Sequence, residues 1–127
     1  MSKTVLNSAN APAAIGPYSQ GIEVNGFVYV SGQIPVDRAT GAIPEGVAAQ
    51  TEQVLKNVSY ILAEAGCTMD DVVKTTVFLS DMGDFAPMNE VYAKHFTGEV
   101  MPARAAVESP KLVKGVLVEI DAIAVKK

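Results

Sequence analysis

The chain has 127 residues, of which 49% are hydrophobic and 19% are charged. That composition suits residues 1–127 as one domain with a hydrophobic core, and it is unlike that of a disordered segment. The net charge is −4, and the ten lysines and arginines are scattered along the chain, which argues against a nucleic-acid-binding surface with its basic stripe.

Metal sites, disulfides and membrane segments are also disfavoured. One cysteine, Cys67, cannot form an internal disulfide, and it cannot build a typical zinc site with one histidine, His95. We expect no metal, and we expect His95 to be a partly exposed helix residue. Residues 1–21 lack the apolar segment of a signal peptide, and no stretch is long enough to cross a bilayer. We therefore expect a cytoplasmic protein that binds no membrane.

The first half of the chain reads as strands followed by a helix. Residues 3–7 suit a first strand, and residues 19–32 contain two β-prone runs around Asn25-Gly26, a dipeptide typical of a type I′ hairpin turn. Residues 33–46 hold two prolines and two glycines and should form a loop. Apolar residues at helical spacing then predict a helix over residues 47–65, which Gly66 should end (Val54, Val58, Ile61, Leu62 and Ala65).

The second half alternates between strands and a second helix. Residues 72–80 are rich in β-branched side chains and predict a strand. A helix should follow over residues 84–96, with Asp84 as its N-cap and four core residues on one face (Phe85, Met88, Tyr92 and Phe96). Two strands, near 103–108 and 116–125, should complete the chain. This order predicts an α+β two-layer domain, with both helices on one face of the sheet and the other face solvated or buried against partner subunits.

One arginine stands out in "MPARAAVES", residues 101–109. Arg104 lies in a run that otherwise reads as a buried strand, and its permanent charge needs an anion there. On the last strand, Glu119 and Asp121 share one face with Leu117 and Ile123, while the wholly apolar alternate face should meet the helices.

Antiparallel pairing of the last two strands, about a turn near Leu112, would place Arg104 opposite Glu119. The residues then leave two interpretations open. Arg104 and Glu119 could form a structural ion pair with no further role. They could instead form a site for a small anion, in which the guanidinium holds a carboxylate and the glutamate moves a proton or activates water.

Five stretches of the chain resemble, in the same order, sequences of the RidA (YjgF) family. They cover almost the whole chain: "APAAIGPYSQG" (11–21), "VYVSGQIP" (28–35), "VVKTTVFLSDMGDF" (72–85), "PARAAVE" (102–108) and "VEIDAIAV" (118–125). The resemblance implies a chorismate-mutase-like α+β fold. It also implies a homotrimer whose sheets pack inside as a barrel, with three small-molecule sites in the clefts between subunits.

Members of the enamine/imine deaminase subgroup hydrolyse 2-aminoacrylate (2-iminopropanoate) and 2-iminobutanoate to 2-oxo acids and ammonia, without a metal or an organic cofactor. By position, the resemblance implies that Arg104 holds the substrate carboxylate and that Glu119 positions or deprotonates water and helps to shuttle the proton. It also implies that Tyr18 lines the site with its hydroxyl group.

The same resemblance places Ser31 and Gly32 at the substrate, together with Asn89 from the neighbouring subunit. Each of these has an ordinary structural alternative: Tyr18 could be a half-buried loop residue, Asn89 a solvated helix residue, and Gly32 the end of a strand. Many family members have a cysteine two positions after the arginine, where this chain has Ala106. Thiol chemistry is therefore not expected at this position.

Two other functions stay open at this point. One is a non-catalytic trimeric binding or regulatory protein for small carboxylates, which would use the same arginine. The other is the ribonuclease or translation-inhibitor activity that has been attributed to some relatives. The acidic balance of the chain and its single histidine disfavour cleavage of RNA.

Overall fold

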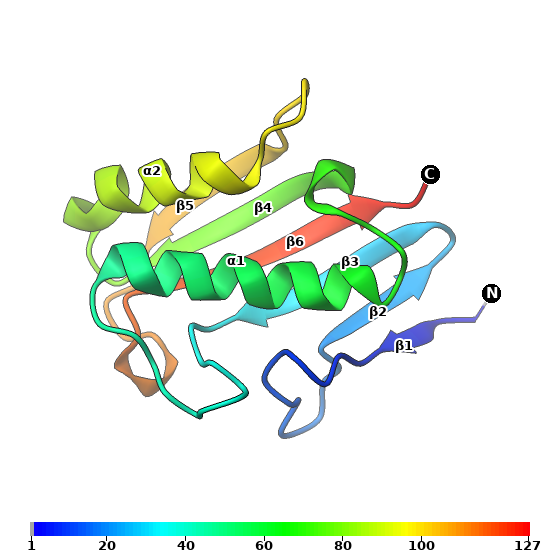
Figure 1. The fold of residues 1–127 in the computed structure, drawn as a ribbon, viewed down its shortest axis with the longest axis horizontal. Coiled ribbons are helices and arrows are strands. Elements are labelled where there is room, and N and C mark those ends of the chain that lie inside the picture. The colour runs from blue at the N-terminus through cyan, green and yellow to red at the C-terminus, as the bar shows by residue number, and fades with distance from the viewer. Residues whose placement is uncertain (1) are drawn as a thin grey trace.

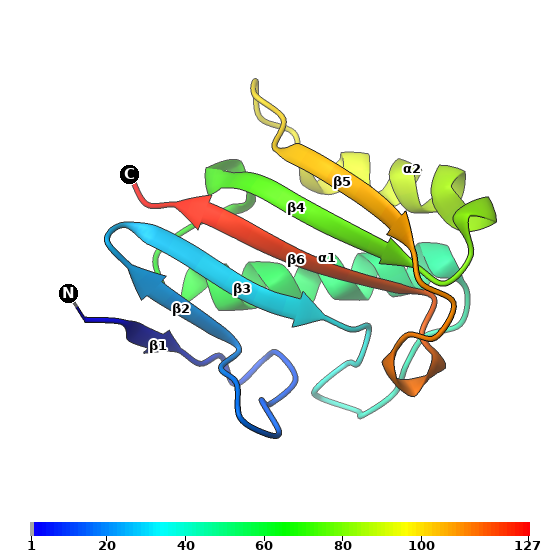
Figure 2. The same ribbon diagram turned by 180° about the vertical axis from the view of Figure 1, so that it is seen from behind.

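The computed structural model describes residues 2–127 and has two layers, a six-stranded sheet and a pair of helices. Both helices cover the same face of the sheet, and the opposite face carries none (Figures 1 and 2). The elements follow the predicted order: β1 (Thr4–Leu6), β2 (Gly21–Val24), β3 (Phe27–Gln33), α1 (Val47–Ala63), β4 (Val72–Leu79), α2 (Phe85–His95), β5 (Ala103–Glu108) and β6 (Val118–Val125). The predicted α+β class is confirmed.

The sheet is mixed, with strand order β1-β2-β3-β6-β4-β5. β4 and β5 are parallel and are joined through α2, whereas the other neighbours are antiparallel. Asn25 (φ 57°) and Gly26 (φ 83°) both adopt the left-handed backbone that a type I′ turn requires, so the predicted hairpin of β2 and β3 is confirmed.

The predicted pairing of the last two strands is wrong. β5 pairs only with β4, in parallel, and β6 lies between β3 and β4. The helical crossover through α2 explains this, because it returns the chain parallel to β4 and leaves β5 as an edge strand. Arg104 therefore pairs with Thr75 and Glu119 with Phe78, on opposite sides of β4.

The two charged side chains also occupy opposite faces of the sheet. Val118 and Ile120 are buried under the helices, so Glu119 between them points to the open face, as predicted. Arg104 instead packs on side chains of α2 and so points to the helix face. The cross-strand ion pair does not exist in the chain.

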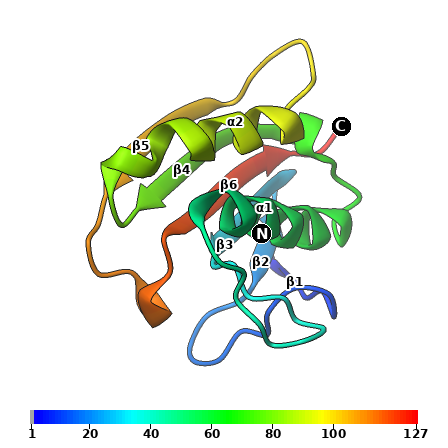
Figure 3. The same cartoon turned by 60° about the vertical axis from the view of Figure 1, so that its left-hand side comes forward.

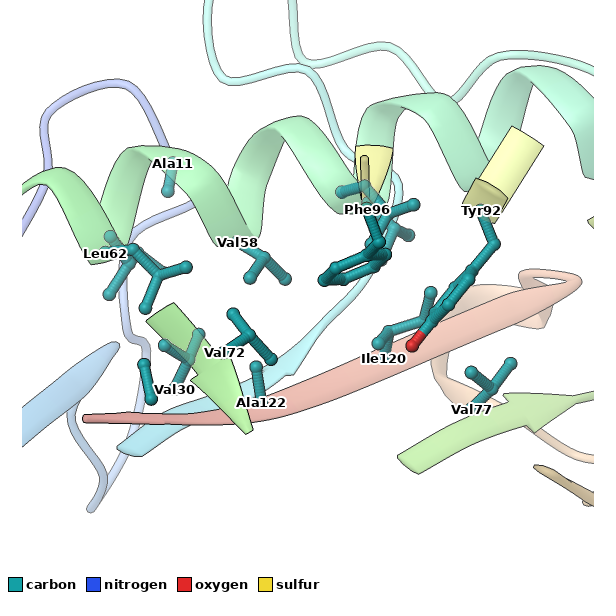
Figure 4. Close-up of a cluster of buried hydrophobic side chains, with 14 of the residues drawn as sticks. Ala11, Val30, Val58, Leu62, Val72, Val77, Tyr92, Phe96, Ile120 and Ala122 are labelled. Carbon is teal, nitrogen blue, oxygen red and sulfur yellow. The ribbon is translucent and has the colours of Figure 1, made fainter. Parts of the chain in front are cut away.

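The core lies between the sheet and the two helices (Figure 4). Val30, Val77 and Ile120 contribute from the sheet, and Val58 and Leu62 from α1. The apolar face predicted for the second helix is buried at Met88 and Tyr92 of α2 and at Phe96 directly after it, and partly buried at Phe85. Asp84 flanks the helix as predicted but makes no capping hydrogen bond; Asp81 caps the preceding short turn by accepting from Gly83 N. Neither helix in residues 2–127 could cross a membrane.

Three connections gather at one end of the sheet, below it in Figure 3. They are the segment between β1 and β2, the segment between β3 and α1, and the segment between β5 and β6. Their polar anchors and the nearby ends of β3 and β6 build the site described next.

Candidate active site

A cavity of about 660 Å³ opens among these three connections. Its wall includes apolar side chains from each of them, namely Ile15, Ile34 and Val113. The polar and charged lining consists of Tyr18, Gln20, Gln33, Arg38, Lys114 and Glu119, and Gly32 contributes at the end of β3. The cavity thus contains three residues that the family resemblance assigned to the site: Tyr18, Gly32 and Glu119.

Gln20 holds the first wall in place. Its side chain is 2% exposed, and its Nε2 donates to the carbonyl oxygens of Ser8, Ala11 and Pro12 at 2.8–3.2 Å. Its Oε1 accepts from Ser8 N at 2.6 Å. Arg38 adds a hydrogen bond to the Ala11 carbonyl at 2.8 Å. Because these bonds satisfy a run of buried backbone groups, the loop that carries Tyr18 has a defined course.

Two polar residues of α1 hold the second wall. Asn57 Nδ2 donates to the carbonyl oxygens of Ile34 and Val36 at 2.9 and 3.0 Å. Gln50 donates to the Pro44 carbonyl at 3.1 Å and accepts from Leu117 N at 2.8 Å. Helix α1 thereby anchors both the β3–α1 loop and the start of β6. Gln20, Gln50 and Asn57 were not among the residues predicted from the sequence, although polar side chains within apolar runs are a signal for such anchors.

Gly32 makes room for the Glu119 carboxylate. A β-bulge interrupts β3 between Val30 and Gln33, so that two residues, Ser31 and Gly32, lie opposite one residue of β6. A Cβ built on Gly32 would overlap Glu119 Oε2. A side chain at position 32 would therefore have to displace the carboxylate end of Glu119 from its present position.

Glu119 is suited to proton transfer. Partial burial raises the pKa of its carboxyl group, and the neighbouring charge of Asp121 raises this pKa further. The ion pairs among residues 2–127 include none with Glu119. A carboxyl group with a raised pKa can hold or release a proton closer to neutral pH than an ordinary one.

Tyr18 and Ser31 occupy different surroundings. Tyr18 is exposed at the cavity, and its hydroxyl oxygen accepts from Ile15 N at 3.4 Å. Ser31 donates its hydroxyl hydrogen to the Ser19 carbonyl at 2.6 Å, and its backbone N donates to Gln20 O at 2.9 Å. Ser31 therefore braces the strand beside the cavity, and its hydroxyl is not among the lining groups.

Arg104 and Asn89 form a second cluster, at the β5 edge of the sheet. Arg104 Nη1 donates to Asn89 Oδ1 at 2.6 Å. The guanidinium carbon lies 4.7 Å from the ring centroid of Tyr92 and 5.3 Å from that of Phe85. No carboxylate among residues 2–127 forms an ion pair with Arg104. Ala106 lies on the same strand, opposite Val77, so no thiol stands near the guanidinium.

The assigned residues thus form two half-sites in one chain. We call Tyr18, Gly32 and Glu119 the cavity half-site, and Asn89 and Arg104 the arginine half-site. β4 separates them, and they lie on opposite faces of the sheet. A small ligand cannot contact both half-sites of the same chain.

Comparison with known proteins identifies the family. The sequence model of the family described as Endoribonuclease L-PSP matches residues 8–126. A 2-iminobutanoate/2-iminopropanoate deaminase of Salmonella typhimurium is 51% identical over 129 residues, covering 100% of both chains. The chain belongs to the RidA (YjgF) family. The resemblance found in the sequence is confirmed.

Two further RidA-family relatives extend this comparison. A RutC family protein of Pyrococcus horikoshii is 54% identical, covering 98% of this chain and 99% of its own. The solved structure of Escherichia coli TdcF with bound serine superposes with a TM-score of 0.91 at 43% identity, covering 98% of this chain and 99% of that one. The mixed sheet and helix pair are thus shared with a relative solved with a small amino acid.

Proposed function

We propose that this chain is a 2-iminobutanoate/2-iminopropanoate deaminase, which hydrolyses 2-aminoacrylate (2-iminopropanoate) and 2-iminobutanoate to 2-oxo acids and ammonia. The observation that carries this proposal is the 51% identity, over the whole chain, to an enzyme of that name. The two half-sites supply the groups that the reaction needs: a free guanidinium for a carboxylate, and an acid with a raised pKa for water and protons.

We further propose a cytoplasmic homotrimer in which the arginine half-site of one subunit completes the cavity half-site of the next. Charge supports this arrangement, because Arg104 has no anion and Glu119 has no cation within the described chain. The open face of the sheet also carries large exposed apolar side chains, among them Phe27 (44% exposed) and Tyr29 (41%). Burying that face against partner subunits removes this surface from water.

In such a composite site each residue has a defined task. The guanidinium fork of Arg104, its pair of parallel N–H donors, binds the substrate carboxylate and orients C2. Asn89 holds this guanidinium in place by accepting a hydrogen bond from it. For the enamine, a proton first goes to C3 and one leaves the nitrogen, which gives the imine. Glu119 then takes a proton from water as the oxygen adds to C2 and passes it to the imine nitrogen, which gives the carbinolamine. Glu119 next takes the proton of the new hydroxyl group as the C2=O bond forms and passes it to the nitrogen, which leaves as ammonia when the C2–N bond breaks. Tyr18 lines the cavity with its hydroxyl group, and Ser31 and Gly32 shape the substrate end of β3.

The proposal is tested by release of the 2-oxo acid in a coupled assay. A threonine dehydratase generates 2-iminobutanoate in situ, and the purified protein is added in increasing amounts. We expect 2-oxobutanoate to appear faster in proportion to the protein added. An unchanged rate, with 2-oxobutanoate binding retained in calorimetry, would instead support the non-catalytic binding protein. RNA cleavage that persists through stringent purification would support ribonuclease activity, although the chain has a net charge of −4.

Gly32→Ala tests the fit between β3 and Glu119. The added methyl group must displace the Glu119 carboxylate, because its Cβ would overlap Oε2. We expect kcat/KM to fall by roughly tenfold to a hundredfold, the order of magnitude that a misplaced catalytic group costs. Steady-state kinetics of the coupled reaction provide the measurement, and the melting temperature serves as the control for folding. Full activity in a folded Gly32→Ala protein would contradict this role.

Asp121→Asn tests the pH dependence. The charge of Asp121 raises the pKa of Glu119, so removing it should lower that pKa and move the acidic limb of the kcat/KM profile to lower pH. The asparagine oxygen can still accept the 3.0 Å hydrogen bond that Thr76 N donates to Asp121. Arg38 and Lys114, which line the cavity, are the same in both proteins. An acidic limb that stays in place or moves to higher pH would contradict the assignment of Glu119.

A further inference from the structure

Arg104 rests on two aromatic rings rather than on an acid. Phe85 and Tyr92 project from α2, and the guanidinium carbon lies 5.3 Å and 4.7 Å from their ring centroids. Its one hydrogen bond within the described residues is to a neutral amide oxygen, that of Asn89. We call Phe85 and Tyr92 the aromatic cradle. The side chain thus contacts three uncharged groups.

An uncharged support suits a group that must bind an anion. Arg104 is exposed on an edge strand, and ordering a free arginine side chain when a ligand binds costs conformational entropy. A neighbouring carboxylate would order it but would also compete with the ligand for the same charge. Aromatic faces attract a guanidinium through their quadrupole and leave its charge available.

Residues beneath the aromatic cradle, on the sheet side, hold Tyr92 in place. The Tyr92 hydroxyl group and Thr75 Oγ1 share a hydrogen bond of 2.7 Å. Thr75 is fully buried and lies directly beside Arg104 in the parallel register of β4 and β5. Tyr92 also packs against Phe96, the residue directly after α2, with ring centroids 4.5 Å apart, and Figure 4 shows both rings reaching toward the sheet. The ring under the guanidinium therefore has little freedom to move.

From these contacts we infer that Phe85 and Tyr92 are positioning residues, which hold the Arg104 fork ready for the carboxylate of the substrate, and that Thr75 orients Tyr92. This inference rests on the proposed function, because it takes Arg104 as the group that binds the carboxylate. It goes beyond the sequence prediction, which treated both aromatic residues only as core. Both rings contact the arginine, while Tyr92 also belongs to the core and Phe85 packs against it.

The experiment measures binding separately from turnover. The dissociation constant of 2-oxobutanoate is determined by calorimetry for the whole protein and for Phe85→Leu, Tyr92→Leu and Tyr92→Phe, alongside KM and kcat in the coupled assay. Loss of either ring should weaken 2-oxobutanoate binding and raise KM by about three- to thirtyfold, with a smaller change in kcat, as expected for a lost cation–π contact. Tyr92→Phe keeps the ring but loses the hydrogen bond to Thr75, so its affinity should lie between those of the original protein and Tyr92→Leu; an affinity equal to that of the original protein would exclude the orienting role of Thr75.

Two comparisons separate positioning from general stability. Tyr60→Leu removes a partly buried aromatic residue of α1 that makes no cation–π contact with Arg104, so it should lower the melting temperature without changing the dissociation constant. In an Arg104→Ala background, Phe85→Leu should cause no further loss of affinity, because the group it positions is gone. Phe85 is only partly buried, so its variant decides the question if Tyr92→Leu does not fold.

The possible results distinguish this inference from the proposed function. Unchanged affinity in Phe85→Leu, or an equal loss in the Arg104→Ala background, would overturn the positioning role even if imines are hydrolysed. Binding that depends on Arg104 and Phe85 without any imine turnover would overturn the deaminase and support the cradle. A protein that neither binds 2-oxobutanoate nor hydrolyses imines would overturn both.

Discussion

Arg104→Ala is expected to lower kcat/KM for 2-iminobutanoate by roughly a hundredfold or more. The substrate carboxylate would lose a charge-assisted, two-point contact, which is worth about 3 kcal/mol in a desolvated site. It would also lose the orientation that brings C2 to the water held by Glu119. The coupled assay at low imine concentration measures this loss directly.

Arg104→Lys makes the matched comparison. The lysine keeps the positive charge, but it cannot bind a carboxylate through two parallel hydrogen bonds and stacks less well on Phe85 and Tyr92. We expect its activity to lie between those of the original protein and Arg104→Ala. Both variants should keep the fold, because Arg104 is exposed and forms no ion pair within the described chain. Undiminished activity in Arg104→Ala would exclude the Arg104 guanidinium as the group that binds the substrate carboxylate.

Local patterns in the sequence were sufficient to predict the helices and strands of this fold. The Asn25-Gly26 turn depends on two adjacent residues with positive φ, and the face of α1 depends on apolar spacing within one helix. The alternation along β6 likewise placed Glu119 and Asp121 on the open face correctly, because the buried residues lie in the same strand. Each of these features is decided by neighbours in the chain.

Strand partners were not predictable in the same way. β5 and β6 are consecutive, and a short connection favours a hairpin. Here the crossover through α2 places β5 beside β4, and β6 fills the position between β3 and β4. The pairing is settled by how α2 packs on the sheet, which no local pattern of β5 or β6 reports. The predicted contact of Arg104 with Glu119 was wrong for this reason.

In the candidate site, too, features that depend on distant parts of the chain could not be predicted from the sequence pattern. Tyr18, Gly32 and Asn89 came from the family resemblance, and the geometry gives each a place in one of two half-sites. The anchoring roles of Gln20 and Asn57 depend on backbone groups 8–12 and 21–23 residues away, so their partners could not be read from spacing. The charge of Arg104 still demanded an anion, and the structure shows that no described acid of the chain supplies it.

Mixing two inactive variants should restore activity, because the two half-sites belong to different subunits of the proposed trimer. Arg104→Ala chains retain the cavity half-site, and Glu119→Gln chains retain the arginine half-site. In a cyclic assembly, each site combines Arg104 from one subunit with Glu119 from the next. Random assembly of equal amounts therefore leaves about a quarter of the sites with both groups intact.

The experiment co-expresses the two variants with different affinity tags and purifies the mixed assemblies, whose kcat per chain is compared with that of each variant alone. Every trimer that contains both variants has one complete site among three, so we expect about a third of the original activity from the mixed assemblies, and almost none from either variant alone. A double variant, Arg104→Ala with Glu119→Gln, co-expressed with the original chain provides the control. In its purified mixed assemblies about a sixth of the sites are intact when the site is shared, but about half when each chain holds its own. Mixed single variants that stay inactive would show that one chain supplies both groups, against the separation of Arg104 and Glu119 by β4.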